Sequence, residues 1–427
     1  MELYSSGVRN RHRLEEKLSL WLLYWSVIMP ILTGIPTIPS ALKYTADVIW
    51  FGLVLCCVLK RKIRIRRDIL PLAFAAAFLL VYVTLTYLLR YQTLRYFIWG
   101  VRNLFRYYVA FFAYAVALKT DRVEKWFDFI EKVFWVNVAI SIYQFAVMGV
   151  VQDFLGGVFG VKGGTNGYTT TLLTIVVTRS LLMSFAKKGN LWRCLLTCAA
   201  AMSVAAMAEI KFFFVLFIVI LICCVIMTKF SLRKLIVTLA GSIAVIIGTR
   251  MLVKWFGFSE VFSIQGIIEE ATKSSYASSS ADDVNRLSAI YTLNQRILTE
   301  PFDRIIGLGL GNCDTSAFAV FNTPFFEAHG AMHYTWFVAP MIYLETGYIG
   351  IAIYISFFVA CFVQAMRKNM RKDGNLLYCR MAMIMSITCC ILMFYNASLR
   401  YEAAYMIYFI LALPFLRQSS GDKTVFR

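Results

Sequence analysis

Two of the three histidines in this 427-residue chain stand four residues apart in "HGAMH", as His329 and His333. A neutral imidazole accepts a proton near pH 7, so either residue could serve as a general base or position a hydroxyl group. A structural or interfacial histidine is the plainer alternative. A zinc site is disfavoured, because Gly330 stands where the HExxH motif requires glutamate and no third histidine is near in sequence. We therefore expect no metal site.

A second set of residues that could do chemistry is cationic and lies within or beside apolar sequence. Arg102 and Arg106, in "GVRNLFRYY", are four residues apart and share one face of a helix. Lys211, in "AEIKFFF", falls in a very short hairpin between two apolar runs. Cations at membrane depth are costly and normally face a cavity or a partner. The remaining members of this set are Arg90, Arg95, Lys162, Arg286, Arg296, Arg304 and Arg400.

Two kinds of partner can compensate these cations. Internal ion pairs with Glu209, Glu345 and Glu402 are one alternative. An anionic ligand is the other, and a pyrophosphate held by guanidinium forks suits the chemistry of arginine. Because the cations outnumber these three acids, the sequence favours an anionic ligand.

The elements that must position these residues are membrane helices. The chain is 60% hydrophobic with a mean hydropathy of +0.68, and apolar runs long enough to cross a bilayer recur along it. We predict an all-α polytopic membrane protein with about twelve transmembrane helices. Pro340 and Gly347 are expected to break the tenth span into a short outer piece and a spanning piece. The predicted spans are 18–35, 44–59, 69–89, 98–118, 132–150, 167–186, 192–209, 211–228, 235–253, 336–366, 375–395 and 403–416.

The formal charge of +19 is explained by how Lys and Arg are distributed between the spans. Basic clusters such as "KRKIRIRRD" and "RKNMRK" occupy alternate gaps, which is the pattern of the positive-inside rule. Both termini are then cytoplasmic, and a nucleic-acid partner is not indicated. Anionic headgroups of membrane lipids are a secondary partner of these basic loops.

One long extracytoplasmic loop, 254–335, follows from this orientation. It separates an N-terminal bundle of nine spans, 1–253, from the C-terminal spans and cytoplasmic tail, 336–427. Its "SSYASSSADD" stretch is typical of a flexible segment, and "VNRLSAIYTLNQRIL" predicts an amphipathic helix over the membrane face. "GLGLGN" predicts a tight turn rather than a nucleotide loop. Cys313 is the one cysteine expected in this polar loop, as a small apolar filler.

These motifs resemble the O-antigen ligase and O-antigen polymerase family of bacterial glycan assembly. The pattern is an arginine in a late outer loop (Arg286), then "PF" followed by "GLGLGN", a histidine (His333) and "YLETGYIGI". Arg296 with Gly307 is similar to an Arg-x10-Gly motif of polymerases. Lys211 would stand where many members carry Ser-Arg. Tyr334, rather than the Asn, Ser or Gln typical of ligases, follows His333, which favours polymerase.

The resemblance implies a GT-C-like glycosyltransferase of the bacterial inner membrane, with no cofactor. An acceptor sugar hydroxyl would attack a glycan carried on undecaprenyl pyrophosphate, with His333 or His329 as base and Arg286 as a further catalytic residue. Its partners would include a flippase and a chain-length regulator protein. A ligase that transfers polymer to a lipid A core, and a lipid-linked glycan flippase or transporter, are the alternatives. The pyrophosphate would be bound by Arg296, Lys211, Arg106, Arg102 and Lys162.

Overall fold

The computed structural model describes residues 2–59, 66–256, 283–316 and 318–417. Within these ranges the chain is helical, with two isolated β-bridges and no strand. Five of the described helices are long and apolar enough to cross a membrane. They are α3 (Leu70–Leu89), α6 (Asn166–Phe185), α9 (Leu232–Phe256), α14 (Val338–Arg371) and α15 (Leu376–Tyr395). The prediction of an all-helical chain with several membrane-crossing helices is confirmed at this level.

Each of the twelve ranges expected from the sequence coincides with a helix. The others are α1 (Glu2–Thr33), α2 (Thr45–Val58), α4 (Leu94–Ala117), α5 (Thr120–Ala146), α7 (Leu191–Met207), α8 (Lys211–Met227) and α16 (Ala403–Ala412). Helices α1 and α5 begin well before the starts expected from the sequence. Their first turns are polar, so a search for apolar runs does not include them. Hydropathy identifies only the apolar part of a helix, whereas the backbone hydrogen bonds of the helix continue through charged residues.

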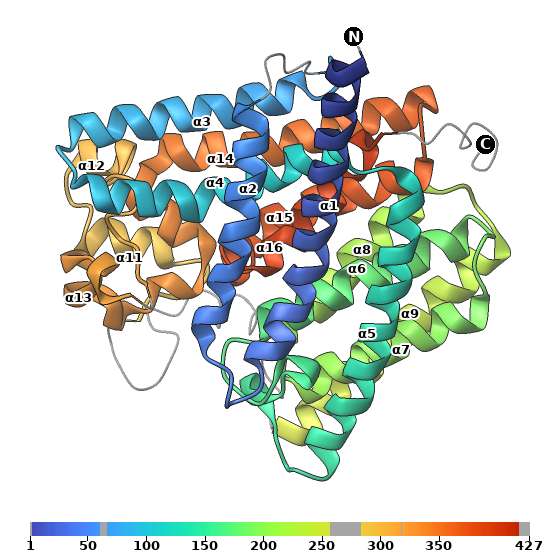
Figure 1. The fold of residues 1–427 in the computed structure, drawn as a ribbon. Coiled ribbons are helices and arrows are strands. Elements are labelled where there is room, and N and C mark those ends of the chain that lie inside the picture. The colour runs from blue at the N-terminus through green and yellow to red at the C-terminus, as the bar shows by residue number, and fades with distance from the viewer. Residues whose placement is uncertain (1, 60–65, 257–282, 317, 418–427) are drawn as a thin grey trace.

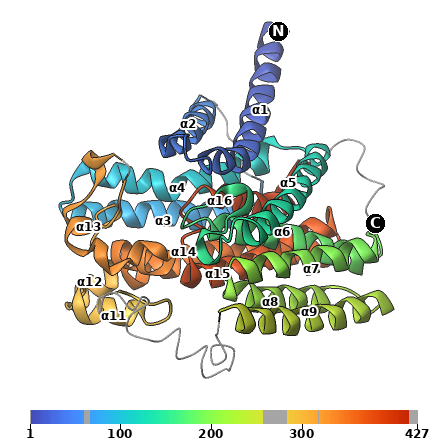
Figure 2. The same ribbon diagram turned by 90° about the horizontal axis from the view of Figure 1, so that it is seen from below.

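The helices pack in layers around α16. Figure 2 shows α1 and α2 on one face of the molecule and α8 and α9 on the opposite face, with α16, α6 and α15 between them. Every residue of α16 is buried, and this helix packs against α1, α4, α6 and α15. Helices α11 (Ala289–Arg296), α12 (Pro301–Ile306) and α13 (Pro324–His329) gather at one end of α3, α4 and α14 (Figure 1). A helix that is apolar all round can be enclosed by other helices or by lipid, and α16 is enclosed by other helices.

Contacts between distant gaps sort the helix ends into two groups. At one end, Lys368 Nζ lies 2.7 Å from Asp68, Arg66 donates to the carbonyl of Phe415, and Lys119 forms a β-bridge with Arg417. At the other end, Gln92 donates to the carbonyl of Leu310 at 2.6 Å, and the gaps around Gly34 and Gly160 touch through their backbones. The first group belongs to the basic gaps of the sequence and the second to the gaps between them. Alternate gaps therefore meet, as successive membrane crossings require.

The amphipathic helix expected over 284–298 is present only as α11, because Val284 and Arg286 precede its first turn. The five apolar residues at helical spacing are buried unequally: Val284 and Leu293 are fully buried, Ile290 and Ile297 are partly buried, and Leu287 is 58% exposed. Most of the stretch expected to be flexible lies outside the described residues. Its last residue, Asp283, is fully buried.

The long helix α14 is interrupted at Gly347 (φ 63°, ψ −167°), as the sequence predicts. Pro340 causes no break, because it lies in the first turn of α14, where a missing N–H costs nothing. The interruption removes the intrahelical donors for the carbonyls just before it. The glycine-rich turn supplies replacements: Leu308 N–H donates to Leu344 O at 2.8 Å and Gly309 N–H to Glu345 O at 3.0 Å.

The turn prediction for "GLGLGN" is confirmed, since Gly307, Gly309 and Gly311 all have positive φ, at 75°, 99° and 85°. These residues bring the chain into backbone contact with α4 and α14. A Cβ on Gly311 would lie 2.0 Å from the carbonyl oxygen of Tyr96. Only glycine combines this conformation with so close an approach.

Gly311→Ala is expected to destabilise the protein strongly, because the left-handed backbone alone costs about 1–3 kcal/mol and the clash adds to it. Thermal unfolding of the protein in detergent measures the loss. Gly163→Ala is the matched control, because a Cβ there meets nothing within 4 Å. We expect that variant to unfold within about 0.5 kcal/mol of the parent. Equal melting of both variants would contradict the packing of this turn.

Candidate functional site

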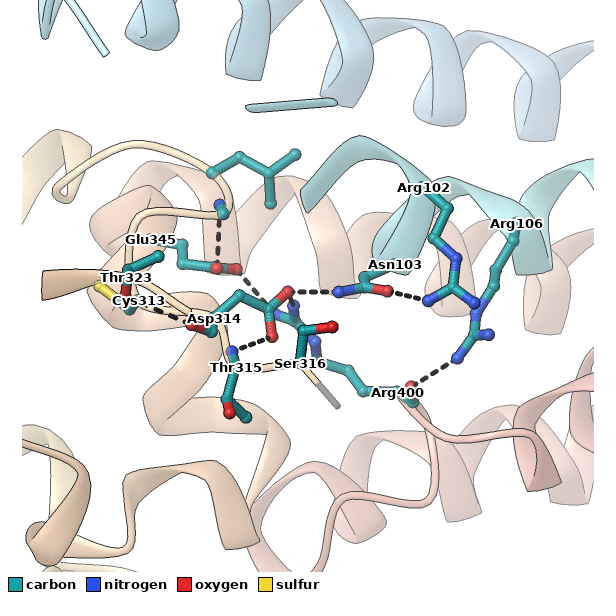
Figure 3. A network of polar contacts seen from close by, with 12 residues as sticks. Arg102, Asn103, Arg106, Cys313, Asp314, Thr315, Ser316, Thr323, Glu345 and Arg400 are labelled. Atoms are coloured by element: carbon teal, nitrogen blue, oxygen red, sulfur yellow. Dashed lines mark hydrogen bonds and ion pairs between the residues drawn. The ribbon is translucent and has the colours of Figure 1, made fainter. Parts of the chain in front are cut away.

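A buried polar network lies where the glycine-rich turn meets α4 and the segment before α16 (Figure 3). Arg400 is its centre: its guanidinium is 2.7 Å from Glu345 and 3.0 Å from Asp314. Asn103 Nδ2 donates to Asp314 at 2.6 Å, and the N–H of Gly311 donates to Glu345 at 2.9 Å. Burial by itself lowers the pKa of the Arg400 guanidinium, but Glu345 and Asp314 raise the pKa above its ordinary value. Arg400 therefore stays charged.

Arg102 and Arg106, expected on one face of a helix, do face the same region of the structure. Arg102 pairs with Asp47 and donates to the side chain of Asn103. Arg106 is 3.3 Å from Glu402 and donates to the carbonyl of Arg400 at 3.2 Å. The ion-pair alternative accounts for these contacts. The acids involved include Asp47 and Asp314, which the sequence reasoning did not count.

A small cavity of about 70 Å³ opens among these side chains. That volume is enough for several water molecules or a small polar group. Its cationic lining consists of Lys43, Arg102, Arg106 and Arg400, its acidic lining of Asp314 and Glu402, and hydroxyl groups come from Thr315, Ser316 and Thr335. Four cations face two carboxylates at the cavity wall, while Asp47 and Glu345 pair with the arginines from behind it.

His333 lies two residues before Thr335, which lines this cavity, and is not itself a lining residue. Its Nδ1 is 2.7 Å from a carboxylate oxygen of Asp283, whose side chain is fully buried. The imidazole stacks on Trp336 with ring centroids 4.1 Å apart and remains 36% exposed. The backbone of His333 is left-handed (φ 54°), an uncommon conformation for this residue type. A buried acceptor on Nδ1 fixes the ring and directs Nε2 away from Asp283.

The ring of Tyr395 contacts both Arg286 and Phe212, the residue that follows Lys211 in the chain. The Arg286 guanidinium lies 4.8 Å from the ring centre of Tyr395 and 5.9 Å from that of Phe337. Phe212, next to Lys211, stacks on Tyr395 at 4.0 Å. A guanidinium held over an aromatic face directs its donors sideways, in the plane of the group.

Glu209 pairs with Lys211 at 3.1 Å, which is one of the internal ion pairs considered from the sequence. The short hairpin between α7 and α8 places that pair at the start of α8, and Glu209 takes positive φ there. Tyr395 precedes the segment that carries Arg400, and Val338 N–H donates to Asn396 O at 3.3 Å. Residues 333–337 and 395–402 therefore join the Arg286 group to the cavity.

Three sequence candidates lie further out. His329 contacts Phe325 with ring centroids 4.7 Å apart. Arg296 is exposed at the last position of α11. Lys162 donates to the carbonyl of Thr33 at 2.5 Å, and partial burial together with nearby Lys43 lowers its pKa. None of these three residues is among those that line the cavity, although Lys43, which lies near Lys162, is.

Several residues of this region were missed as site residues. Asp283 ends a serine-rich stretch that reads as flexible, and Asp314 and Asp47 carry no motif. Arg400 was recognised as a cation but not as the centre of a network. Its sequence neighbourhood, "SLRYE", places two opposite charges beside an apolar run, and this is the one signal that the sequence offers.

A larger cavity of about 400 Å³ lies at the opposite end of the molecule. Arg66 and Lys368 line it and both pair with Asp68, and Asp373 is a second acid of the lining, so the two cations are balanced by two carboxylates. In the described ranges, no group of three or more His, Cys, Asp and Glu side chains is arranged to hold a metal ion. Cys313 is buried, and its carbonyl accepts from Tyr334 Oη at 2.7 Å. The His333 end is therefore the better candidate for chemistry.

Arg400→Ala is expected to cost about 3–5 kcal/mol of stability, because it leaves Glu345 and Asp314 buried without a countercharge. Their side chains are 0% and 6% exposed. Thermal unfolding in detergent, followed by size-exclusion chromatography, provides the measurement. Arg193→Ala is the control, since Arg193 is 63% exposed in its pair with Glu131. Its loss should be about 1 kcal/mol at most. Comparable losses in both variants would show that the network contributes no special stability.

No protein-family model matches this sequence, and no characterised protein gives a significant match.

Proposed function

We propose that the protein is a membrane glycosyltransferase that joins oligosaccharide repeat units carried on undecaprenyl pyrophosphate into a polysaccharide. The observation that carries this proposal is the pair of His333 and buried Asp283, 2.7 Å apart, in the same loop as Arg286. A histidine oriented by a carboxylate is an arrangement suited to taking a proton from a hydroxyl group. The motif resemblance described above supplies the substrate class.

In the proposed reaction, the sugar hydroxyl of one lipid-linked unit attacks the anomeric carbon of another. Nε2 of His333 takes the hydroxyl proton as the new C–O bond forms. The bond between the anomeric carbon and the pyrophosphate oxygen breaks, and the electron pair leaves with undecaprenyl pyrophosphate. The imidazolium formed on His333 is stabilised by Asp283.

The cations have the complementary role of stabilising the leaving group. In this proposal Arg286 supplies one positive charge, and Lys211, whose neighbour Phe212 stacks on the same Tyr395 ring, supplies a second. Preorganised donors of this kind stabilise charge that develops in the transition state. Arg102 and Arg106 are held by acids, so in this proposal they shape the cavity wall and contribute a polarised surface. In this proposal Arg296 and Lys162 bind the incoming lipid-linked unit outside the cavity lining.

The proposal includes an orientation. The chain crosses the bacterial inner membrane twelve times, and both termini and the basic gaps face the cytoplasm. The 254–335 segment and the His333 site then face outward, where lipid-linked units are presented. The division into 1–253, 254–335 and 336–427 follows from this topology. The grouping of alternate gaps at two ends of the molecule supports it.

Deleting the gene and analysing the lipid-linked glycans tests the proposal. A polymerase predicts that single repeat units accumulate on undecaprenyl pyrophosphate. Long polymer accumulating on that lipid would instead identify the ligase, which uses the same chemistry on a lipid A core acceptor. Single units retained on the cytoplasmic side would identify a flippase and overturn the proposal. Unchanged intermediates would exclude all three.

A further inference from the structure

The short helix α12 has an apolar side that faces outward. Phe302 and Ile305 stand three positions apart, on one side of the helix, and are 56% and 45% exposed. A polar loop outside a membrane has little reason to expose two large apolar residues side by side. Isolated exposed apolar residues are ordinary, but a continuous patch indicates a partner.

The charged groups of α12 are turned toward the protein and compensated there. Asp303 pairs with Arg90 at 2.6 Å, and the Arg90 guanidinium also lies over the ring of Phe302 at 5.0 Å. Arg304 donates to the carbonyls of Leu298 and Asn294 at 2.8 and 3.1 Å. Charges arranged in this way leave Phe302 and Ile305 as the large outward side chains of α12, while the carboxylate of its N-cap residue, Glu300, is exposed.

The outward side of α12 continues the apolar surfaces of two membrane-crossing helices. The backbone of Ile305 touches Gly347, and Tyr348 and Ile349, which follow, are 47% and 42% exposed. Tyr82 in α3 donates to the carbonyl of Thr346 at 2.7 Å. On the same helix, Leu85 and Leu88 are 53% and 58% exposed. Figure 1 shows α12 beside the ends of α3 and α14.

We propose that α12 is seated in the interfacial layer of the bilayer, with Phe302 and Ile305 in contact with lipid acyl chains. Tyr348 fits this depth, because its ring is exposed while its hydroxyl accepts from Asn294 at 2.9 Å. The glycine-rich turn connects α12 to Asp314. The position of α12 in the interface therefore sets the depth of the candidate site relative to the lipid headgroups. The inference concerns the membrane and stands apart from the proposed reaction.

Fluorescence quenching in nanodiscs of phosphatidylethanolamine and phosphatidylglycerol tests whether α12 lies in the interfacial layer of the bilayer. Phe302→Cys and Ile305→Cys are each labelled with an environment-sensitive dye, and the unsubstituted chain labelled in parallel gives the background from native thiols. We expect lipids that carry a nitroxide on the acyl chain to quench the dye at both positions. Iodide dissolved in the aqueous buffer should quench neither.

Val320→Cys is the matched control, because Val320 is 58% exposed in the turn that stacks Phe321 on Trp99 at the cavity. This position should respond to iodide and not to the acyl-chain nitroxide. The two α12 positions report independently, so a folding defect in one variant leaves the other as the test. Quenching of the α12 positions by iodide, with no effect of the nitroxide, would overturn the inference.

Discussion

His333→Ala is expected to abolish polymer formation while leaving the protein in the membrane. In the proposed reaction the imidazole is the base for the acceptor hydroxyl, and removing a general base lowers a rate by about 10²–10⁴-fold. Its side chain is 36% exposed and packs on Trp336 rather than within the core, so the fold should tolerate the change. Long-chain polysaccharide separated on a gel, compared at equal protein level in the membrane fraction, is the measurement.

Asp283→Asn refines this test. The amide keeps the size of the carboxylate but no longer stabilises an imidazolium, and it can donate to Nδ1 and so favour the wrong tautomer. We expect a large loss of polymer in this variant. His329→Ala separates the two histidines: if that variant alone loses polymer, the base is His329 and the mechanism is otherwise retained. Normal chain lengths in both His333→Ala and His329→Ala would reject an imidazole base.

Arg286→Ala is expected to be equally severe, for a different reason. The guanidinium over Tyr395 is proposed to stabilise the pyrophosphate as the anomeric bond breaks, and removing one such preorganised donor costs about 10²–10³-fold in rate. The same gel assay measures the loss. Accumulation of single lipid-linked units in the variant would show that the block is in joining units rather than in supplying them.

The variant Arg286→Lys distinguishes the effect of the positive charge from the effect of the planar guanidinium geometry. Lysine keeps the positive charge but lacks the planar group that stacks on Tyr395 and offers paired donors. We expect polymer to be largely lost in this variant too. Full activity with lysine would mean that only charge is needed, and full activity with alanine would remove Arg286 from the mechanism. Arg193→Ala, at the opposite end of the molecule, is the charge-removal control.

The sequence alone located the helices, because a run of apolar residues within one stretch of chain is enough to predict each of them. Apolar runs repeat at the length of a bilayer crossing, and each of the twelve predicted ranges contains a helix. The hairpin before Lys211, the break at Gly347 and the turn from Gly307 to Gly311 were also predictable. Each depends on the conformational preferences of a few adjacent residues, above all glycine. The polar starts of α1 and α5 were missed because hydropathy does not register them.

Tertiary structure alone decided which charged groups meet. Arg400 pairs with Glu345 and Asp314, 55 and 86 residues away, and Asn103 reaches Asp314 across 211 positions. In the sequence, Asp283 was indistinguishable from the serine-rich residues before it until His333, 50 residues later, was placed beside it. Helix packing brings such groups together, and their sequence separation leaves no periodic trace. The sequence therefore determined which side chains could do chemistry, and the packing of α4, α14 and the segment before α16 decided which of them share a site.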